Sequence, residues 1–306
     1  MTWLEEFEIW LESQTMSTHT IKSYVGDLRQ FSDWMGKRQG EDFEAGKLTA
    51  VDVRAYQKAL QGMKRHPATV NRKINALRTF ARFASGKYTG GSIQEEISGL
   101  VKKIEEPAPM PRAISKQDSS RLLAAYEREI SHEQLKGRTG RYRQAVMQRA
   151  ILYLQRGGGL RTGEAVALDA GDVVLKERSG YVIVRQGKGG KYAEQPLPAE
   201  TRYYLAEWIR IRGSQPGALF TSQKGGRLGA RQVQRYFAAM CERAGLKGTY
   251  TPHSNRHTFI RTLVADPNVP LPEAQKLARH ARVEMTLRYA MATEEDLQAA
   301  VERVFS

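Results

Sequence analysis

The sequence predicts a mainly α-helical protein whose second half contains one small antiparallel β-sheet. Three observations lead to this fold class. Apolar residues recur at helical spacing over most of the chain, one stretch is rich in Val, Ile and Tyr between glycine turns, and three prolines fall within residues 107–111. With 306 residues, of which 41% are hydrophobic, the chain can bury the cores of two or three domains.

The first domain is expected to span residues 1–105 and to be all helical. Thr49 and Asp52 have the spacing of a helix-capping pair, and Gly36, Gly62 and Gly86 stand where helices are expected to end. This pattern predicts four or five short helices. The apolar positions that define it are Trp3, Leu4, Phe7, Trp10, Leu11, Tyr24, Leu28, Phe31, Val70, Ile74, Leu77 and Ala81.

A linker is predicted at residues 106–113, because prolines remove backbone donors and favour extended chain. The second domain then spans residues 114–306. Its polar segment at 131–143, which contains four basic residues and few apolar ones, is expected to be a basic loop. Two or three short strands are expected within 172–198. The main later helices are expected at 199–212, 230–244 and 252–265.

The charge of the chain indicates a polyanionic partner. There are 48 basic and 33 acidic residues, which gives a formal charge of +15. The first 106 residues hold 16 Lys and Arg against 14 Asp and Glu, and the rest of the chain holds 32 against 19. The excess charge therefore belongs mainly to the second domain. A surface that is basic only for solubility is the alternative.

Composition excludes several classes of protein. Cys241 is the only cysteine, which excludes an intramolecular disulfide and a thiolate-rich metal site. No apolar stretch approaches the roughly 20 residues that a membrane-spanning helix needs. The first 14 residues contain four glutamates and no early basic cluster, unlike a secretory or transit signal. We therefore expect a cytoplasmic protein without a membrane segment.

Four segments in the second half contain residues suited to phosphoryl transfer. They are Gly-Leu-Arg-Thr-Gly-Glu-Ala at 159–165, Gly-Lys-Gly-Gly-Lys at 187–191, Pro-His-Ser-Asn-Arg-His at 252–257, and His280 followed nine residues later by Tyr289. Each pattern alone is weak, because such short patterns occur by chance. In this order they resemble the signatures of the tyrosine recombinases, also called phage integrases, which include the Xer recombinases. The resemblance covers nearly the whole chain.

The resemblance implies a nucleophile, a proton donor and two cationic clamps. Tyr289 would be the nucleophile, and a phenol with a pKa of about 10 needs nearby cations or a base to become one. Arg161 and Arg256 would grip the nonbridging oxygens of the scissile phosphate, because a guanidinium stays charged and binds two oxygens at once. Lys188 would protonate the leaving 5′ oxygen, with Lys191 as the neighbour that could be confused with it.

Two histidines complete the implied catalytic set. His253 would hydrogen-bond the phosphate or assist proton transfer to and from Tyr289, and His280 would orient the phosphate. Glu164 would hold the guanidinium of Arg161. His257 is interpreted as a packed helix residue that hydrogen-bonds its neighbours.

At two positions the sequence departs from the usual family pattern. Asn255 stands where the family usually has leucine, and Arg279 precedes His280 where glycine is usual. Neither departure removes a catalytic side chain. We expect local packing around His253 and His280 to differ from that of relatives.

The activity implied by the resemblance is site-specific DNA recombination through a covalent 3′-phosphotyrosyl intermediate, for integration, excision or resolution. No cofactor and no metal are expected. His253 and His257 lie four residues apart, but there is no His-Glu-x-x-His arrangement and no third ligand cluster. The alternatives are an enzyme like a type IB topoisomerase, which relaxes one duplex, and a DNA-binding protein without catalysis.

Double-stranded DNA is the implied partner. In relatives, a helical core-binding domain of the SAM-like type and the catalytic domain clamp the duplex, and most of the affinity comes from phosphate contacts. The polar face of the helix at about 69–85 also contains Asn71. The candidate DNA contacts are Asn75, Arg78 and Arg82 in the first domain and Arg231, Gln234 and Arg235 in the second.

The family acts as a homotetramer on two DNA sites. In relatives the last segment of the chain docks on a neighbouring subunit, and residues 293–305 carry apolar side chains on one side of a helical pattern. We expect this segment to pack on a neighbouring subunit.

Overall fold

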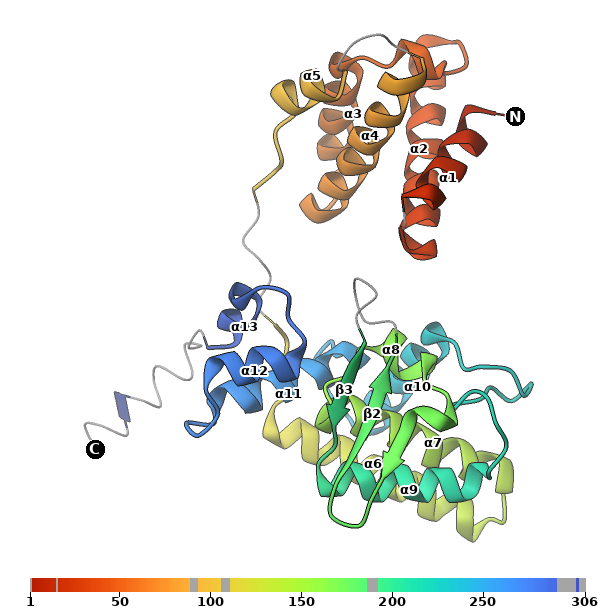
Figure 1. The fold of residues 1–306 in the computed structure, drawn as a ribbon, viewed down its shortest axis with the longest axis vertical. Helices are drawn as coiled ribbons and strands as arrows, with labels where there is room; N and C mark the ends of the chain where they lie inside the picture. The colour runs from red at the N-terminus through yellow and green to blue at the C-terminus, as the bar shows by residue number, and fades with distance from the viewer. Residues whose placement is uncertain are drawn as a thin grey trace. The chain divides into compact units, whose positions relative to one another are not determined.

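The computed structural model describes residues 2–14, 16–88, 93–105, 111–185, 192–290 and 301–302. The chain divides into two compact units, Met1–Ala108 and Pro109–Ser306, called unit 1 and unit 2 below (Figure 1). The division falls inside the stretch predicted to be a linker, of which residues 106–110 lie outside the described residues.

Unit 1 consists of five α-helices and a short 3-10 helix in the part of the chain that the structure describes. The helices are α1 (Trp3–Ser13), α2 (Thr18–Gln39), η1 (Ala45–Lys47), α3 (Ala50–Gly62), α4 (Pro67–Lys87) and α5 (Ile93–Leu100). Thr49 caps α3 through its hydroxyl, which accepts from the Asp52 N–H at 3.2 Å. The core is rich in aromatic rings, and Phe7, Phe31 and Phe80 are fully buried in it.

Polar side chains of α3 and α4 fasten the chain that follows α5. The Asn71 side chain donates to the Ile104 carbonyl and accepts from the Ile104 N–H, both at 2.9 Å. Gln57 donates to the Lys102 carbonyl at 2.8 Å, and Arg78 donates to the Val101 carbonyl. Because Asn71 is buried, it takes no part in the exposed face of α4.

Unit 2 is helical apart from one sheet in its described residues. The elements are α6 (Lys116–Leu135), α7 (Thr139–Gly157), α8 (Thr162–Ala167), η2 (Ala170–Asp172), β1 (Val173–Leu175), β2 (Gly180–Val184), β3 (Ala193–Pro196), α9 (Ala199–Arg212), α10 (Ala230–Arg243), α11 (Pro252–Ala265), α12 (Leu271–Ala278) and α13 (Val283–Ala290). Strands β1, β2 and β3 form an antiparallel sheet in that order, with Val182 opposite Val173 and Gln195. The predicted fold class, mainly α with one small antiparallel sheet, is therefore confirmed.

Helix α7 occupies the centre of unit 2, where it packs against α6, α9 and α11 (Figure 1). Its buried side chains include Val146, Ile151 and Leu154. On α9, the buried Trp208 belongs to the same core and donates through Nε1 to the Leu219 carbonyl at 3.0 Å. Helices α12 and α13 pack against α11 and against each other, so α11 connects the core to the carboxyl-terminal helices.

The predicted loop at 131–143 is wrong. Helix α6 continues to Leu135 and α7 begins at Thr139, so only residues 136–138 connect them. Gly137, with φ of 63°, makes this tight turn. Glu133 is buried near Arg138 and Arg141, at 3.7 and 4.0 Å, so polar residues in this stretch are part of packed helices.

Two predicted helix ends are also displaced. Helix α2 passes through Gly36 and ends at Gly40, which has φ of 77° and donates to the Gly36 carbonyl. Helix α4 continues past Gly86 to Lys87, and only Gly62 is the last residue of its helix, α3. Among the described helices, none has the length and apolar character needed to span a membrane.

Candidate active site

The glycine-rich turn between α7 and α8 positions Arg161. Gly159 has φ of 62°, and a Cβ atom at this position would lie 2.4 Å from the Phe259 ring of α11. Only glycine fits this conformation and this close contact. The chain then becomes extended at Arg161, which is the N-cap of α8.

Glu164 holds Arg161 from the first turn of α8. Its Oε2 accepts the Arg161 backbone N–H at 2.9 Å, and its Oε1 accepts from Arg161 Nη1 at 2.7 Å. Oε2 also accepts from Arg279 Nη2 at 2.5 Å. Burial opposes ionisation of this carboxyl, but the Arg279 charge and the bonds from Arg161 outweigh it and keep the pKa of Glu164 below its ordinary value.

Arg256, on α11, joins three segments that are distant in sequence. Its side chain is 1% exposed, and its two Nη nitrogens donate to the carbonyls of Gly159 and Ala278. Each Nη carries a second hydrogen, so donors remain for a phosphate. Burial, with the nearby Arg161 and Arg279 charges, lowers the pKa of Arg256 to about 9, and the group is therefore still cationic at neutral pH.

Tyr289, on α13, points at a histidine. Its hydroxyl lies 2.5 Å from Nδ1 of His257 on α11. The His253 ring lies one turn earlier, with its centroid 4.6 Å from that of His257, and the His280 ring stacks on Tyr289 at 6.1 Å. Thr286, fully buried, contacts Nδ1 of His280 through its Oγ1 at 2.9 Å.

The surroundings make these histidines neutral and the phenol hard to ionise. Burial, together with His253 and Arg256, lowers the pKa of His257 to about 4, and burial with Arg256 and Arg161 lowers that of His280 to about 4. A neutral His257 can accept the phenol proton at Nδ1. Burial raises the pKa of Tyr289, whereas Arg256 and Arg161 act in the opposite direction.

The structure thus brings together most of the residues that the sequence pattern selected. Glu164 and Arg256 contact the segments of Arg161 and His280, and His253, His257 and Tyr289 form one row of rings. Lys188 and its neighbour Lys191 belong to the β2–β3 connection at 186–191, which lies outside the described residues. No group of three His, Cys, Asp or Glu side chains that could hold a metal ion occurs among the described residues.

Sequence reasoning missed two features of this site. His257 was interpreted as a packed helix residue that hydrogen-bonds its neighbours, and the partner that the sequence did not identify is the Tyr289 hydroxyl. Arg279 was noted only as a departure from the usual glycine, and its guanidinium reaches Glu164 and Gln195. The family pattern contained a signal for Arg279, because a position that is usually glycine often requires a positive φ, and Arg279 has φ of 51°.

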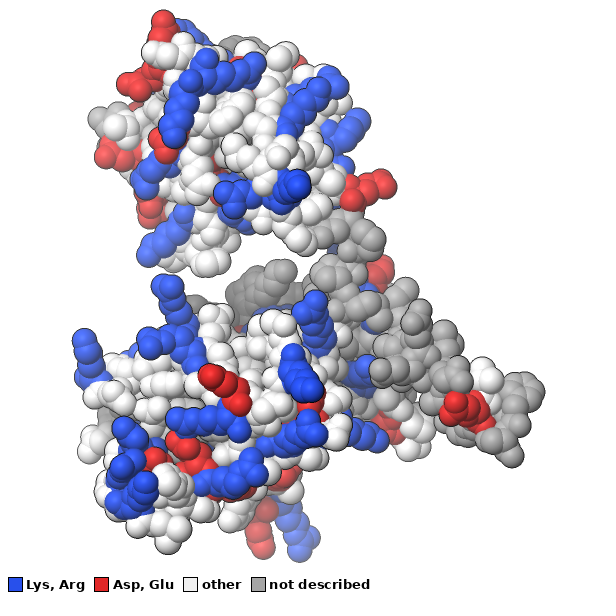
Figure 2. All heavy atoms as spheres, turned by 180° about the vertical axis from the view of Figure 1, so that it is seen from behind, with Lys and Arg blue, Asp and Glu red and all other residues white. Residues whose placement is uncertain are grey.

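The candidate DNA contacts lie on two helices, one in each unit. On α4, Asn75 and Arg82 are exposed, Arg82 lies over the Trp10 ring at 5.1 Å, and Arg78 is partly buried by its bond to Val101. On α10, Arg231, Gln234 and Arg235 are all exposed. Figure 2 shows Lys and Arg side chains spread over the surface of both units.

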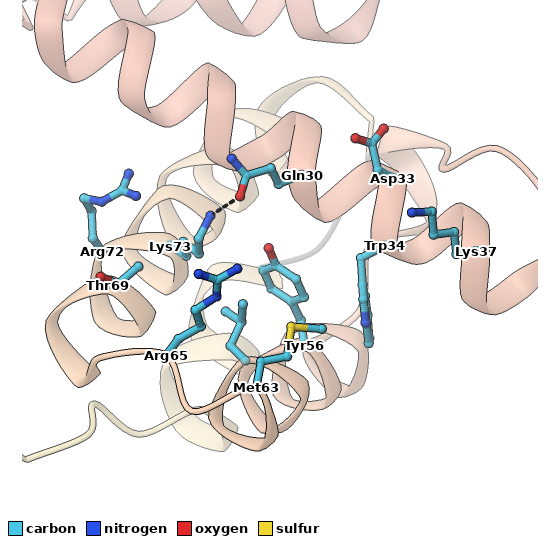
Figure 3. A pocket seen from close by; sticks show the side chains of 11 residues that line it. Gln30, Asp33, Trp34, Lys37, Tyr56, Met63, Arg65, Thr69, Arg72 and Lys73 are labelled. Atoms are coloured by element: carbon cyan, nitrogen blue, oxygen red, sulfur yellow. Dashed lines mark hydrogen bonds between the residues drawn. The ribbon is translucent and has the colours of Figure 1, made fainter.

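A cation-lined hollow of about 590 Å³ opens between α2, α3 and α4 of unit 1 (Figure 3). Asp27, buried beside it, binds Arg72 and accepts from Lys73 Nζ at 2.9 Å, and Lys73 also donates to Gln30 at 2.6 Å. Within the described residues, Lys37 and Arg65 have no carboxylate at ion-pair distance. The other lining residues include Trp34, Tyr56, Leu60, Met63 and Thr69. Sequence reasoning missed this hollow, because its cations come from α2, from α4 and from the connection between α3 and α4.

Replacing Asn255 by leucine should stabilise unit 2. Asn255 is 1% exposed, and neither its Nδ2 nor its Oδ1 has a hydrogen-bond partner among the described residues. An unpaired buried polar group costs about 1–3 kcal/mol, so Asn255→Leu should raise the free energy of unfolding by an amount of that order. Urea unfolding measures it, with the exposed Asn75→Leu as the control. An unchanged or lower urea midpoint for Asn255→Leu would contradict the conclusion that Asn255 destabilises the core.

Acid should destabilise unit 2 through its neutral histidines. Because the folded pKa of His257 is about 4 and its ordinary value is 6.5, the unfolded chain binds more protons between these values. The free energy of unfolding should therefore fall as the pH drops below about 6.5. His257→Gln removes one such group, so the loss between pH 7 and pH 5, measured by urea unfolding at both, should shrink. An equal loss in both proteins would show that His257 is not held neutral.

Comparison with known proteins agrees with this geometry. Residues 114–296 match the Phage integrase family, and residues 4–87 match the Phage integrase, N-terminal SAM-like domain. The tyrosine recombinase XerC of Rhodospirillum centenum is 29% identical over 311 residues, which cover 98% of this chain and 85% of that protein.

Two solved structures share the fold. The XerH site-specific recombinase bound to palindromic difH substrate, a post-cleavage complex, has a TM-score of 0.70 and 18% identity, covering 92% of this chain and 78% of that one. A lambda integrase tetramer bound to a Holliday junction has a TM-score of 0.69 and 18% identity, covering 94% and 76%. The family match favours recombination over the topoisomerase and binding-protein alternatives. The chain belongs to the phage integrase family, and it is a tyrosine recombinase.

Proposed function

We propose that this recombinase exchanges DNA strands through a covalent ester between Tyr289 and a 3′ phosphate. The observation that carries the proposal is the Tyr289 hydroxyl, which lies 2.5 Å from the neutral His257 and close enough to Arg256 and Arg161 for both charges to oppose the burial that raises its pKa. A phenol between a base and two guanidinium groups is suited to attack phosphorus.

The cleavage step balances with the groups of this chain. Tyr289 Oη forms a bond to phosphorus, its proton passes to His257, and the bond from phosphorus to the 5′ oxygen breaks. Lys188 gives a proton to that oxygen, which leaves as a 5′-hydroxyl. A 5′-hydroxyl of another strand then reverses the attack, so one phosphodiester replaces another and no external energy source is needed.

The remaining groups bind the phosphate. Arg161 and the free Nη hydrogens of Arg256 would bind the nonbridging oxygens, where charge accumulates in the transition state. His253 and His280 would bond the same phosphate, and a bound anion would raise the lowered pKa of each histidine. His257 would in this way become a stronger base once DNA is present.

DNA is the partner in this proposal, and the assembly is a homotetramer on two sites. The Lys and Arg side chains on the surfaces of both units and the DNA-bound relatives support DNA as the partner. The lambda integrase tetramer supports the homotetramer. Residues 293–305, which would pack on a neighbouring subunit, lie outside the described residues except for 301 and 302. In this proposal the protein acts in the cytoplasm, where it meets its DNA.

Tyr289→Phe should abolish the covalent adduct and leave DNA binding intact, because only the attacking oxygen is removed. The measurement uses a duplex with the target site, nicked near the scissile phosphate so that religation cannot occur, followed by denaturing electrophoresis. Tyr203→Phe, which removes a hydroxyl from a tyrosine that is 67% exposed on α9, is the matched control and should form the adduct normally. An adduct that persists in Tyr289→Phe would refute the assigned nucleophile.

The hollow of unit 1 should bind DNA phosphates through its unpaired cations. The double variant Lys37→Ala/Arg65→Ala, made in the Tyr289→Phe protein, removes both. Its plot of log affinity against log salt concentration should be less steep, by about 0.9 for each phosphate contact that is lost. Lys47→Ala, which removes a lysine already paired with Glu44 at 3.0 Å, is the control. Equal slopes for the double variant and the control would exclude these contacts.

A further inference from the structure

Arg279 adopts a backbone conformation that side chains disfavour. It follows α12 with φ of 51° and ψ of 47°, the left-handed region. Among the described residues, the only other non-glycine residue with positive φ is Lys64, at 52°. A residue with a Cβ atom is disfavoured here, so its side chain is expected to make compensating contacts.

The guanidinium of Arg279 makes these contacts with two other segments. Nη2 donates to Glu164 Oε2 of α8, and Nη1 donates to Gln195 Oε1 of β3, both at 2.5 Å. The Arg279 side chain is 13% exposed, and Gln195 is 2% exposed. One planar fork therefore fastens α8, β3 and the end of α12 to one another.

Two of these segments hold a residue of the proposed reaction. Glu164 holds Arg161 by two hydrogen bonds, His280 follows Arg279 directly, and β3 follows the connection that contains Lys188. A shift of α8 or of the end of α12 by about 1 Å would misplace Arg161 or His280, and such a misplacement can cost about 100-fold in rate.

Arg279 also changes the charge of the site. If Arg161 alone contacted Glu164, the carboxylate would neutralise the cation that has to bind the phosphate. The second guanidinium on the same carboxylate leaves the group of three with one excess positive charge. The excess charge is more accessible at Arg161, which is 25% exposed, than at Arg279, which is 13% exposed.

We propose that Arg279 is a positioning residue, which holds Glu164 so that Arg161 keeps its position and its charge for the scissile phosphate. The inference rests on the proposed covalent cleavage. The family usually has glycine at this position, which has no side chain to make such contacts. In this chain the Arg279 side chain connects the two segments.

Arg279→Gly is the decisive variant, because glycine suits the left-handed backbone and the chain should fold. We expect the maximal rate of adduct formation on the nicked duplex to fall about 10- to 100-fold, while the DNA concentration at half-maximal rate stays the same. Guanidinium chloride at low millimolar concentration should restore part of the rate. Arg279→Lys should remain slow, since an ammonium lacks the fork that reaches both acceptors.

Two controls separate positioning from folding. Lys64→Gly places glycine at nearly the same φ in unit 1 and should unfold in urea at or above the wild-type midpoint, whereas Arg279→Gly also loses its contacts with Glu164 and Gln195 and should still unfold in one cooperative transition. In Glu164→Gln, the further change Arg279→Gly should cost less than it does in the wild-type protein, because the two residues act as one unit.

Failure of the positioning role and failure of the proposed function give different results. A wild-type rate in Arg279→Gly, or a defect in DNA affinity with an unchanged maximal rate, would overturn the positioning role. Equal costs of Arg279→Gly with and without Glu164 would also overturn it. Failure of the wild-type protein itself to form an adduct would contradict the proposed function instead, so the two results can be told apart.

Discussion

The catalytic unit depends on the buried guanidinium of Arg256. Its two bonds to the carbonyls of Gly159 and Ala278 join α11 to the turn before α8 and to the end of α12. Those two segments carry Arg161 and His280, and α11 itself carries His253 and His257. The residues come from positions more than 100 apart in the chain, yet one planar group sets their spacing. A lysine at this position could not replace it, because an ammonium cannot span the two carbonyls.

This arrangement leaves more positive charge in the site than the protein neutralises. Arg161, Arg256 and Arg279 approach one another around a single carboxylate, Glu164, and burial and mutual repulsion lower the pKa of Arg256 and Arg279. Such an excess is unfavourable in the free protein and becomes favourable when a phosphodiester enters. Burial, assisted by His253 and by the Arg256 charge, keeps His257 neutral, and so the free site already contains an acceptor for the phenol proton. The uncompensated positive charge therefore lowers the stability of the free site, and in the proposed reaction a bound phosphate would offset this cost.

The fold class could be predicted from the sequence, since apolar spacing depends on neighbouring residues, and the short motifs selected side chains that the structure brings together around Arg256. What the sequence could not supply was the partner of each group. The order His280 and then Tyr289 does not tell which histidine the phenol meets, because that depends on how α13 packs on α11. The helical stretch around Glu133 looked like a loop, because buried charge can only be recognised once its arginine neighbours are known. Gly40, not Gly36, ends α2, and both fit the same local rule.

The two departures from the family pattern have opposite physical consequences, although each puts a polar residue at a position near the site. Asn255 replaces an apolar residue in a fully buried place and finds no partner among the described residues. Arg279 replaces glycine in a strained place, and its guanidinium reaches two buried acceptors on other segments. The presence of a polar side chain in a core therefore does not by itself show whether it stabilises or destabilises the fold. What matters is whether its length lets it reach groups that lack a partner, which an arginine can do over several ångströms and an asparagine cannot. The contacts of Arg279 offset its backbone conformation, whereas the burial of Asn255 has no visible compensation.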